Sequence, residues 1–190
     1  MGWDRVIIPS ALQLSPFQQG DGSALCGLYS ILNAIQLALW PQHTLTKTEL
    51  KRLINACALS TPSRLLDVLG NGIEEEPWVD LSIELLAKAG QLSKHQLAAK
   101  FFLRGKAGAR TDTAMRAIKR ELQASRPVLV MLWGAYDHAT VISGMTRHRV
   151  HLFDSSGFRW VRLSSIGLNH AWSTKLHRIA KWSAMAIECS

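Results

Sequence analysis

The sequence has only three cysteines, Cys26, Cys57 and Cys189, which are widely separated along its 190 residues. So few and scattered thiols argue against a disulfide framework, and no Cys-x-x-Cys pair is present as a zinc-binding unit. We therefore expect reduced cysteines. Each is free to take part in chemistry or in packing.

Long hydrophobic runs and targeting segments are also missing. No stretch of about 18 apolar residues occurs, and the opening "MGWDRVIIPS" resembles neither a secretory signal nor a transit peptide. A composition of 47% hydrophobic and 19% charged residues is typical of a globular protein in water. We expect a cytoplasmic protein without a membrane partner, with secretion as an effector lacking a cleaved signal as the alternative.

Linkers, internal repeats and low-complexity tracts are absent, so residues 1–190 are expected to form a single domain. The net charge is +8, and the basic residues are concentrated in the second half of the chain. A basic surface attracts acidic partners, but no nucleic-acid-binding motif accompanies the charge. We expect a protein or peptide partner, acidic or ubiquitin-like, and disfavour nucleic acid.

The first two thirds of the chain have helical patterns. Between residues 24 and 40 apolar side chains recur every three or four positions, which predicts a helix with one buried stripe that Pro41 ends. The stripe consists of Leu25, Leu28, Leu32, Ile35 and Leu39. Further helices are predicted over 47–58 with Thr46 as its cap, 62–69, 81–89, 92–103, and 111–125 with Thr111 or Asp112 as its cap.

After Pro127 the pattern changes to short runs rich in β-branched and aromatic residues. These runs are "VLVMLW", "HATVISGM", "RVHLFDSS", "FRWVRLS" and the closing "WSAMAIEC". The sequence therefore predicts an α+β fold, in which a helical N-terminal part packs on a C-terminal antiparallel sheet.

Cys26 lies where a segment of small residues, Gly-Asp-Gly-Ser, runs into the first predicted helix. The free N–H groups and the dipole at a helix start favour a negative charge, so a thiol there is more readily ionised. The competing interpretation is a buried structural cysteine, because free cysteines are commonly buried. A catalytic role requires a partner base.

His138 is the best candidate for that base. If "HATVISG" and "HRVHLFD" form a hairpin closed by a three-residue loop at 145–147, His138 lies directly opposite Asp154. Opposed side chains are about 4.5–5.5 Å apart at Cβ, so the carboxylate can hold the imidazole. Asp137 is disfavoured because adjacent strand residues point to opposite faces. A two-residue loop would put Asp154 on the other face and destroy the pairing.

The segments "LCGLYSILNA", "DHATVISG" and "HLFDSSG" resemble the papain-like cysteine peptidase superfamily, with cysteine, histidine and aspartate in that chain order. The aspartate makes the chain similar to C39-like bacterial peptidases and, more distantly, to Josephin-like deubiquitinases. The resemblance implies one papain-like peptidase domain, in which the nucleophile helix packs on the sheet.

In such enzymes a glutamine shortly before the cysteine helps to stabilise the oxyanion. The resemblance assigns this role to Gln19, with Gln18 as its rival, together with the Cys26 N–H. It implies that Cys26, His138 and Asp154 hydrolyse a peptide or isopeptide bond through a thioester. No cofactor is expected.

Three alternatives remain at this point. Transglutaminase-like acyltransferases also use cysteine, histidine and aspartate, although they tend to carry a tryptophan beside the histidine, where this chain has Ala139, and a proline after the aspartate, where it has Ser155. A catalytically inactive binding module on a peptidase scaffold is the second. A metal site is the third and is disfavoured, because His148 and His151 are predicted on opposite faces of one strand.

Overall fold

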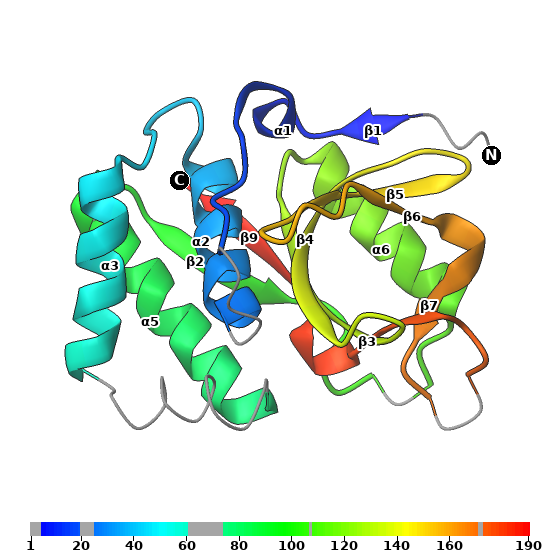
Figure 1. The fold of residues 1–190 in the computed structure, drawn as a ribbon. Coiled ribbons are helices and arrows are strands. Elements are labelled where there is room, and N and C mark those ends of the chain that lie inside the picture. Colours follow the sequence, from blue (N-terminus) through cyan, green and yellow to red (C-terminus); the bar gives the residue numbers. More distant parts are fainter. Residues whose placement is uncertain (1–4, 20–24, 61–73, 107, 171–172) are drawn as a thin grey trace.

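The computed structural model describes residues 5–19, 25–60, 74–106, 108–170 and 173–190. Within them, five α-helices and one nine-stranded sheet form an α+β fold (Figure 1). The helices are α1 (Ser10–Gln13), α2 (Cys26–Leu39), α3 (Lys47–Ser60), α5 (Glu75–Ser93) and α6 (Thr111–Gln123). The strands are β1 (Val6–Ile7), β2 (Leu97–Phe101), β3 (Val128–Gly134), β4 (His138–Met145), β5 (Arg149–Phe153), β6 (Trp160–Arg162), β7 (Ile166–Leu168), β8 (His177–Ile179) and β9 (Met185–Cys189).

The main path of the sheet runs in the order β2-β9-β3-β4-β5-β6, and its neighbouring strands are antiparallel. This confirms the α+β class. The sheet is not confined to the C-terminal part, however, because β1 pairs with β4 and β2 pairs with β9. In addition, β7 and β8 are parallel to each other.

The predicted helix over 92–103 is wrong. Its first residues end α5, and 97–101 form strand β2, in which burial alternates from one residue to the next. The backbone of β2 pairs with β9 from Leu97 opposite Cys189 to Phe101 opposite Met185. This long-range pairing outweighs the local helical preference of the alanines and lysine in the segment.

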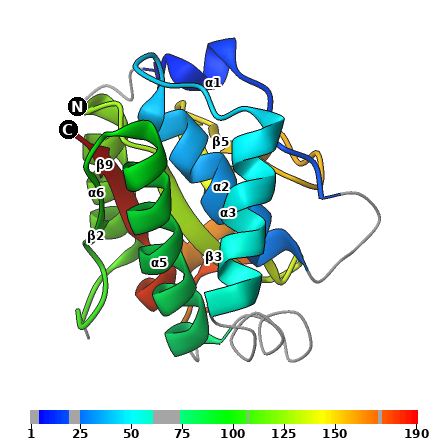
Figure 2. The ribbon, with the colours of Figure 1, turned by 90° about the vertical axis from the view of Figure 1, so that its left-hand side faces the viewer.

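The sheet lies between helices, with α2 packed on one face and α6 on the other (Figure 1). Both faces of β4 are covered, and all eight of its residues are buried. Helices α3 and α5 lie on the outer side of α2 (Figure 2). Helix α2 is therefore an inner element of the fold.

This position explains a difference from the sequence prediction for α2. The helix does not have a single buried stripe, because nearly its whole circumference is buried, including the polar residues Ser30, Asn33 and Gln36. Its start at Cys26 and its end before Pro41 agree with the prediction.

The starts of the other helices agree only in part with the caps predicted from the sequence. Thr46 caps α3 as predicted: its hydroxyl accepts from the Glu49 N–H at 3.2 Å, and the Glu49 carboxylate accepts from the Thr46 N–H at 2.8 Å. Helix α6 begins at Thr111, but the capping position is Arg110, without a side-chain cap, so neither predicted cap is used. The helix predicted over 62–69 lies outside the described residues.

Among the helices that the structure describes, none is long and apolar enough to cross a membrane.

Candidate active site

Cys26 is the first residue of α2, where the helix abuts the beginning of β4. Burial raises the pKa of its thiol, but a hydrogen bond with His138, the Ala139 N–H, the charge of His138 and the Gly27 N–H together lower it below its ordinary value. The sulfur thus has two backbone donors and one imidazole, all of which favour the thiolate. The segment of small residues at 20–24 lies outside the described residues.

His138 is the first residue of β4, and its ring lies between the cysteine and an acid. Its Nε2 is 2.7 Å from Oδ2 of Asp154. Because Nε2 is engaged by the carboxylate, we assign the hydrogen bond with Cys26 to the other ring nitrogen, Nδ1. Burial lowers the pKa of this imidazole, but Asp154 and Cys26 outweigh burial and raise the pKa to about 9. The ring is therefore a strong base that is positively charged at neutral pH.

Asp154 directly follows β5 and is buried, with 2% of the residue exposed. Its Oδ1 accepts from the Ser156 N–H at 2.8 Å and from the Phe158 N–H at 3.3 Å, which leaves Oδ2 for His138. Burial raises the pKa of this carboxyl, but the hydrogen bond to His138 and the neighbouring donors hold it below its usual range. Asp154 is thus an oriented carboxylate that carries a negative charge.

The strand register that brings His138 and Asp154 together differs from the prediction. The hairpin loop is longer than three residues: Met145 pairs with Val150, and the Thr146 N–H bonds the Arg149 carbonyl at 2.8 Å. In the predicted register Ile142 faces Val150, whereas in the structure it faces Leu152.

A β-bulge in β4 compensates for the longer loop. The register shifts by one residue between Ile142 and Gly144, so β4 contains one extra residue there. The loop alone would turn Asp154 to the wrong face, and the bulge turns it back to the face of His138. The two residues are consequently diagonal neighbours on one face, not a directly opposed pair, and long side chains bridge that separation.

The two candidate oxyanion glutamines are placed beside the loop that follows Asp154. The Gln19 amide donates to Ser156 Oγ at 2.9 Å, and its oxygen accepts from Ser155 Oγ at 3.1 Å. The Gln18 amide donates to the Pro16 carbonyl at 3.3 Å and the Asp154 carbonyl at 3.5 Å. Among the described residues, neither amide forms a hydrogen bond with Cys26.

Two buried polar residues of α2 hold the segment that carries these glutamines, and they were not predicted. Asn33 accepts from the Phe17 N–H at 2.7 Å and donates to the Phe17 carbonyl at 3.2 Å, while Gln36 donates to the Ser15 carbonyl at 3.2 Å. The available signal was their polarity within an otherwise apolar helix. They anchor the backbone of Ser15 and Phe17, directly before Gln18 and Gln19.

An aromatic cluster beside His138 was also missed. Phe158 presents its ring to the imidazole edge to face at 5.5 Å, and it stacks on Tyr136 at 4.2 Å. Tyr136 in turn contacts His177, whose pKa burial lowers. Each of the two aromatics lies within four residues of His138 or Asp154 in the sequence, which was the available signal. The cluster shields the histidine from solvent.

Asp137, the rejected alternative to Asp154, has a different function. It has a positive φ of 44° and accepts the Gly134 N–H at 2.9 Å, so it stabilises the turn before β4. Its carboxylate forms no hydrogen bond with His138 among the described residues.

The described part of the chain contains no group of three or more histidine, cysteine, aspartate or glutamate side chains arranged to hold a metal ion. The predicted placement of His148 and His151 on opposite faces of one strand is nevertheless wrong. His148 precedes β5 and lies in the hairpin loop, and both histidines line one pocket.

The chain matches no protein-family model, and no curated protein is significantly similar to it.

Proposed function

We propose that this protein is a cysteine hydrolase that cleaves a peptide or isopeptide bond, with Cys26 as nucleophile, His138 as base and Asp154 as the orienting acid. The observation that carries the proposal is the chain of contacts from a helix-start thiol, through one imidazole, to a buried carboxylate 2.7 Å from Nε2. His138 lowers the pKa of Cys26, and Asp154 raises the pKa of His138, while His138 lowers the pKa of Asp154. These are the directions that a thiolate nucleophile beside an imidazolium requires.

In the proposed reaction His138 holds the proton of Cys26, and the Cys26 thiolate attacks the carbonyl carbon of the substrate. The resulting oxyanion collapses to a thioester as the amine leaves with the proton from His138. Water then loses a proton to His138 and attacks the thioester, which releases the acid and restores the pair of Cys26 thiolate and His138 imidazolium. Asp154 holds the ring in place and supports its positive charge in both halves of the reaction.

The oxyanion requires donors, and the Cys26 N–H at the start of α2 is the first we propose. Gln19 is the second, as the resemblance implies. Its amide now rests on Ser155 and Ser156, so this role requires the side chain to rotate from the loop toward Cys26. Gln18, whose weak bonds to two carbonyls are easier to break, is the rival.

The papain-like arrangement, as one domain over 1–190, belongs to the same proposal. It is supported by the order of the three residues and by a nucleophile helix packed against the strand that carries the histidine. We propose a protein or peptide substrate, acidic or ubiquitin-like, because the chain has a net charge of +8.

A binding module without catalytic activity is the second candidate. The observation that favours it is burial: Cys26 is 6% exposed and His138 is 7% exposed, so a substrate carbonyl has little access to the sulfur. In this alternative the three residues only stabilise the fold and have no catalytic function, and Cys26 reacts no faster than the other cysteines.

Limited alkylation with iodoacetamide, followed by peptide mass mapping of Cys26, Cys57 and Cys189, separates the two. A catalytic site predicts preferential labelling of Cys26, because burial raises the pKa of Cys189 whereas that of Cys26 is lowered. The preference should vanish in His138→Ala and persist in His151→Ala, a control histidine outside the site. Equal labelling of all three thiols in the wild type would contradict catalysis.

The reaction itself is tested with a library of peptides and ubiquitin-like conjugates, with Cys26→Ala as the inactive control. An added amine acceptor distinguishes hydrolysis from acyl transfer, because an acyltransferase incorporates the amine. Release of free carboxylate by the wild type alone supports the proposal. Amine incorporation in preference to hydrolysis would favour the transglutaminase-like alternative.

A further inference from the structure

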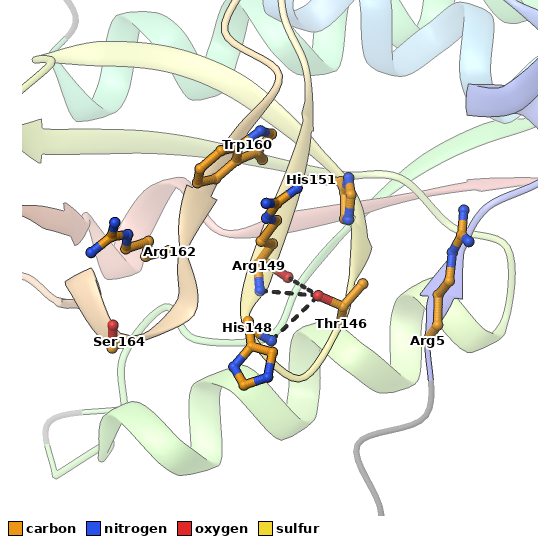
Figure 3. A pocket seen from close by; sticks show the side chains of 8 residues that line it. All are labelled: Arg5, Thr146, His148, Arg149, His151, Trp160, Arg162 and Ser164. Atoms are coloured by element: carbon orange, nitrogen blue, oxygen red, sulfur yellow. Dashed lines mark hydrogen bonds between the residues drawn. The ribbon is translucent and has the colours of Figure 1, made fainter.

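The pocket that His148 and His151 line has a volume of about 730 Å³ and opens at the hairpin end of β4 and β5 (Figure 3). Its lining comes from the residue before β1, the hairpin loop, β5 and β6. The side chains that matter are Arg5, His148, Arg149, His151, Trp160 and Arg162. We call this the arginine pocket. Its volume falls within the range of about 300–1,000 Å³ typical of small-molecule sites.

Unbalanced positive charge distinguishes the arginine pocket. Arg149 and Arg162 are directly opposed across β5 and β6, an arrangement in which like charges repel. Arg5 adds a third guanidinium from the other side (Figure 3). Among the residues that the structure describes, no carboxylate lines the pocket and none of the three arginines forms an ion pair. The three arginines thus line one pocket without a counter-ion among the described residues.

The neighbouring groups are suited to an anion. The Arg149 guanidinium lies 4.2 Å from the ring centroid of Trp160, which limits its freedom before any ligand arrives. His151 faces Trp160 across the strands, and its Nε2 is buried without a hydrogen-bond partner among the described residues. Burial and the charges of Arg5 and Arg149 lower the pKa of His151. A bound anion would supply the negative charge that balances the arginines and an acceptor or donor for His151.

The arginine pocket is separate from the candidate active site. Successive residues of a strand point to opposite faces, so Arg149 and His151 project from the face of β5 opposite to that of Leu152 and Asp154. Any ligand in the pocket therefore does not touch the triad.

We propose that the arginine pocket binds a phosphorylated small molecule through a phosphomonoester or pyrophosphate group. Three permanent positive charges require more than one carboxylate, whereas a phosphomonoester carries a charge of about −1.5 to −2 near pH 7. One guanidinium group can donate two parallel hydrogen bonds to two oxygens of a phosphate. The described residues that line the pocket include arginines but no lysine. The exposed part of Trp160 leaves room for the organic part of the ligand to pack.

Isothermal titration of the full chain with sodium pyrophosphate, at constant ionic strength in a phosphate-free buffer, tests the proposal. Parallel titrations use inorganic phosphate, adenosine diphosphate, a glutamate-rich peptide and a single-stranded oligonucleotide. Saturable pyrophosphate or nucleotide binding is expected. Arg162→Gln should weaken it about tenfold or more, because one charge-assisted contact is lost.

Arg159→Gln is the matched control. Arg159 is exposed and precedes Trp160 in the chain, but it lines a different pocket, so its loss should change affinity by less than about twofold. Removal of the opposed charge in Arg162→Gln should also leave the ligand-free protein equally or more heat-stable, which shows that weaker binding is not misfolding. Three outcomes would overturn the proposal: no saturable binding of pyrophosphate or nucleotide, equal weakening by both substitutions, or binding of the peptide or oligonucleotide alone.

Discussion

Replacement of Asp154 by asparagine is the sharpest test of the triad. Asparagine keeps the shape of the side chain and an Oδ1 acceptor for the Ser156 and Phe158 N–H groups, so the turn after β5 is retained. What is lost is the negative charge 2.7 Å from Nε2 of His138. The substitution therefore changes the electrostatics of the imidazole more than the fold.

The size of the effect follows from that one bond. A buried hydrogen bond to a charged group is worth about 1.5–3 kcal/mol, and one pKa unit corresponds to about 1.4 kcal/mol. The pKa of His138, about 9 in the wild type, should therefore fall by about 1–2 units in Asp154→Asn. Since the imidazolium stabilises the Cys26 thiolate, the equilibrium constant between the ion pair and the uncharged pair should fall about ten- to hundredfold.

The assay is the rate of Cys26 alkylation by iodoacetamide, measured by mass spectrometry across the pH range. The wild type should react at neutral pH as a thiolate and keep its imidazolium up to about pH 9. In Asp154→Asn the rate at neutral pH should drop, and it should recover at alkaline pH, where the thiol ionises without help. Asp137→Asn is the matched control, because Asp137 is the adjacent carboxylate and bonds the Gly134 N–H instead of the ring. Identical pH profiles for Asp154→Asn and the wild type would refute the reasoning.

Three further predictions concern stability. In Cys26→Ser, Asp154 still raises the pKa of His138, although by less than in the wild type because the thiolate is gone, and no lowered thiol pKa offsets it. The unfolding free energy should therefore fall more steeply than in the wild type as pH rises from about 6.5 through the folded pKa of His138 in the variant. Urea titrations at several pH values measure this, and parallel curves would contradict it. Gly144→Ala should destabilise the protein by about 1–3 kcal/mol, because the new Cβ would lie 2.7 Å from Ile7 Cγ1 and 2.8 Å from the Val6 carbonyl oxygen. The control is Gly157→Ala, where the space is open but φ is +87°, and it should lower the unfolding free energy by only about 1 kcal/mol in the same urea assay. Equal losses in the two variants would argue against the close contact with β1. Asn33→Ala should lower the unfolding free energy by about 1–3 kcal/mol, because two backbone groups of Phe17 lose their partner; a thermal midpoint like that of the wild type would disprove this anchoring.

Much of the local structure was predictable from the sequence, because it depends on neighbours in the chain. Periodicity and capping chemistry predict the helix that starts near Cys26 and ends before Pro41, and the cap that Thr46 forms. The β-rich runs after Pro127 follow from their composition and from the turn residues between them. The segment 92–103 failed for the opposite reason. Its conformation is set by pairing with β9, about 90 residues further along the chain.

The composition of the candidate site was likewise readable from the sequence, since a helix-start thiol, a strand-start histidine and a carboxylate after the next strand are local features. That these three side chains lie close together in space could not be predicted. The longer hairpin loop would have turned Asp154 to the wrong face, and the single extra residue of β4 between Ile142 and Gly144 turned it back.

The sequence by itself determined which residue types begin α2 and β4 and which one follows β5. Only the tertiary structure decided that His138 and Asp154 share a face of the sheet and that Gln19 contacts the loop of Ser155 and Ser156. It also decided that three arginines line one pocket without a counter-ion among the described residues. The physical reason is that strand register has a period of two, so one inserted residue reverses every later side chain, whereas the sequence pattern around it hardly changes.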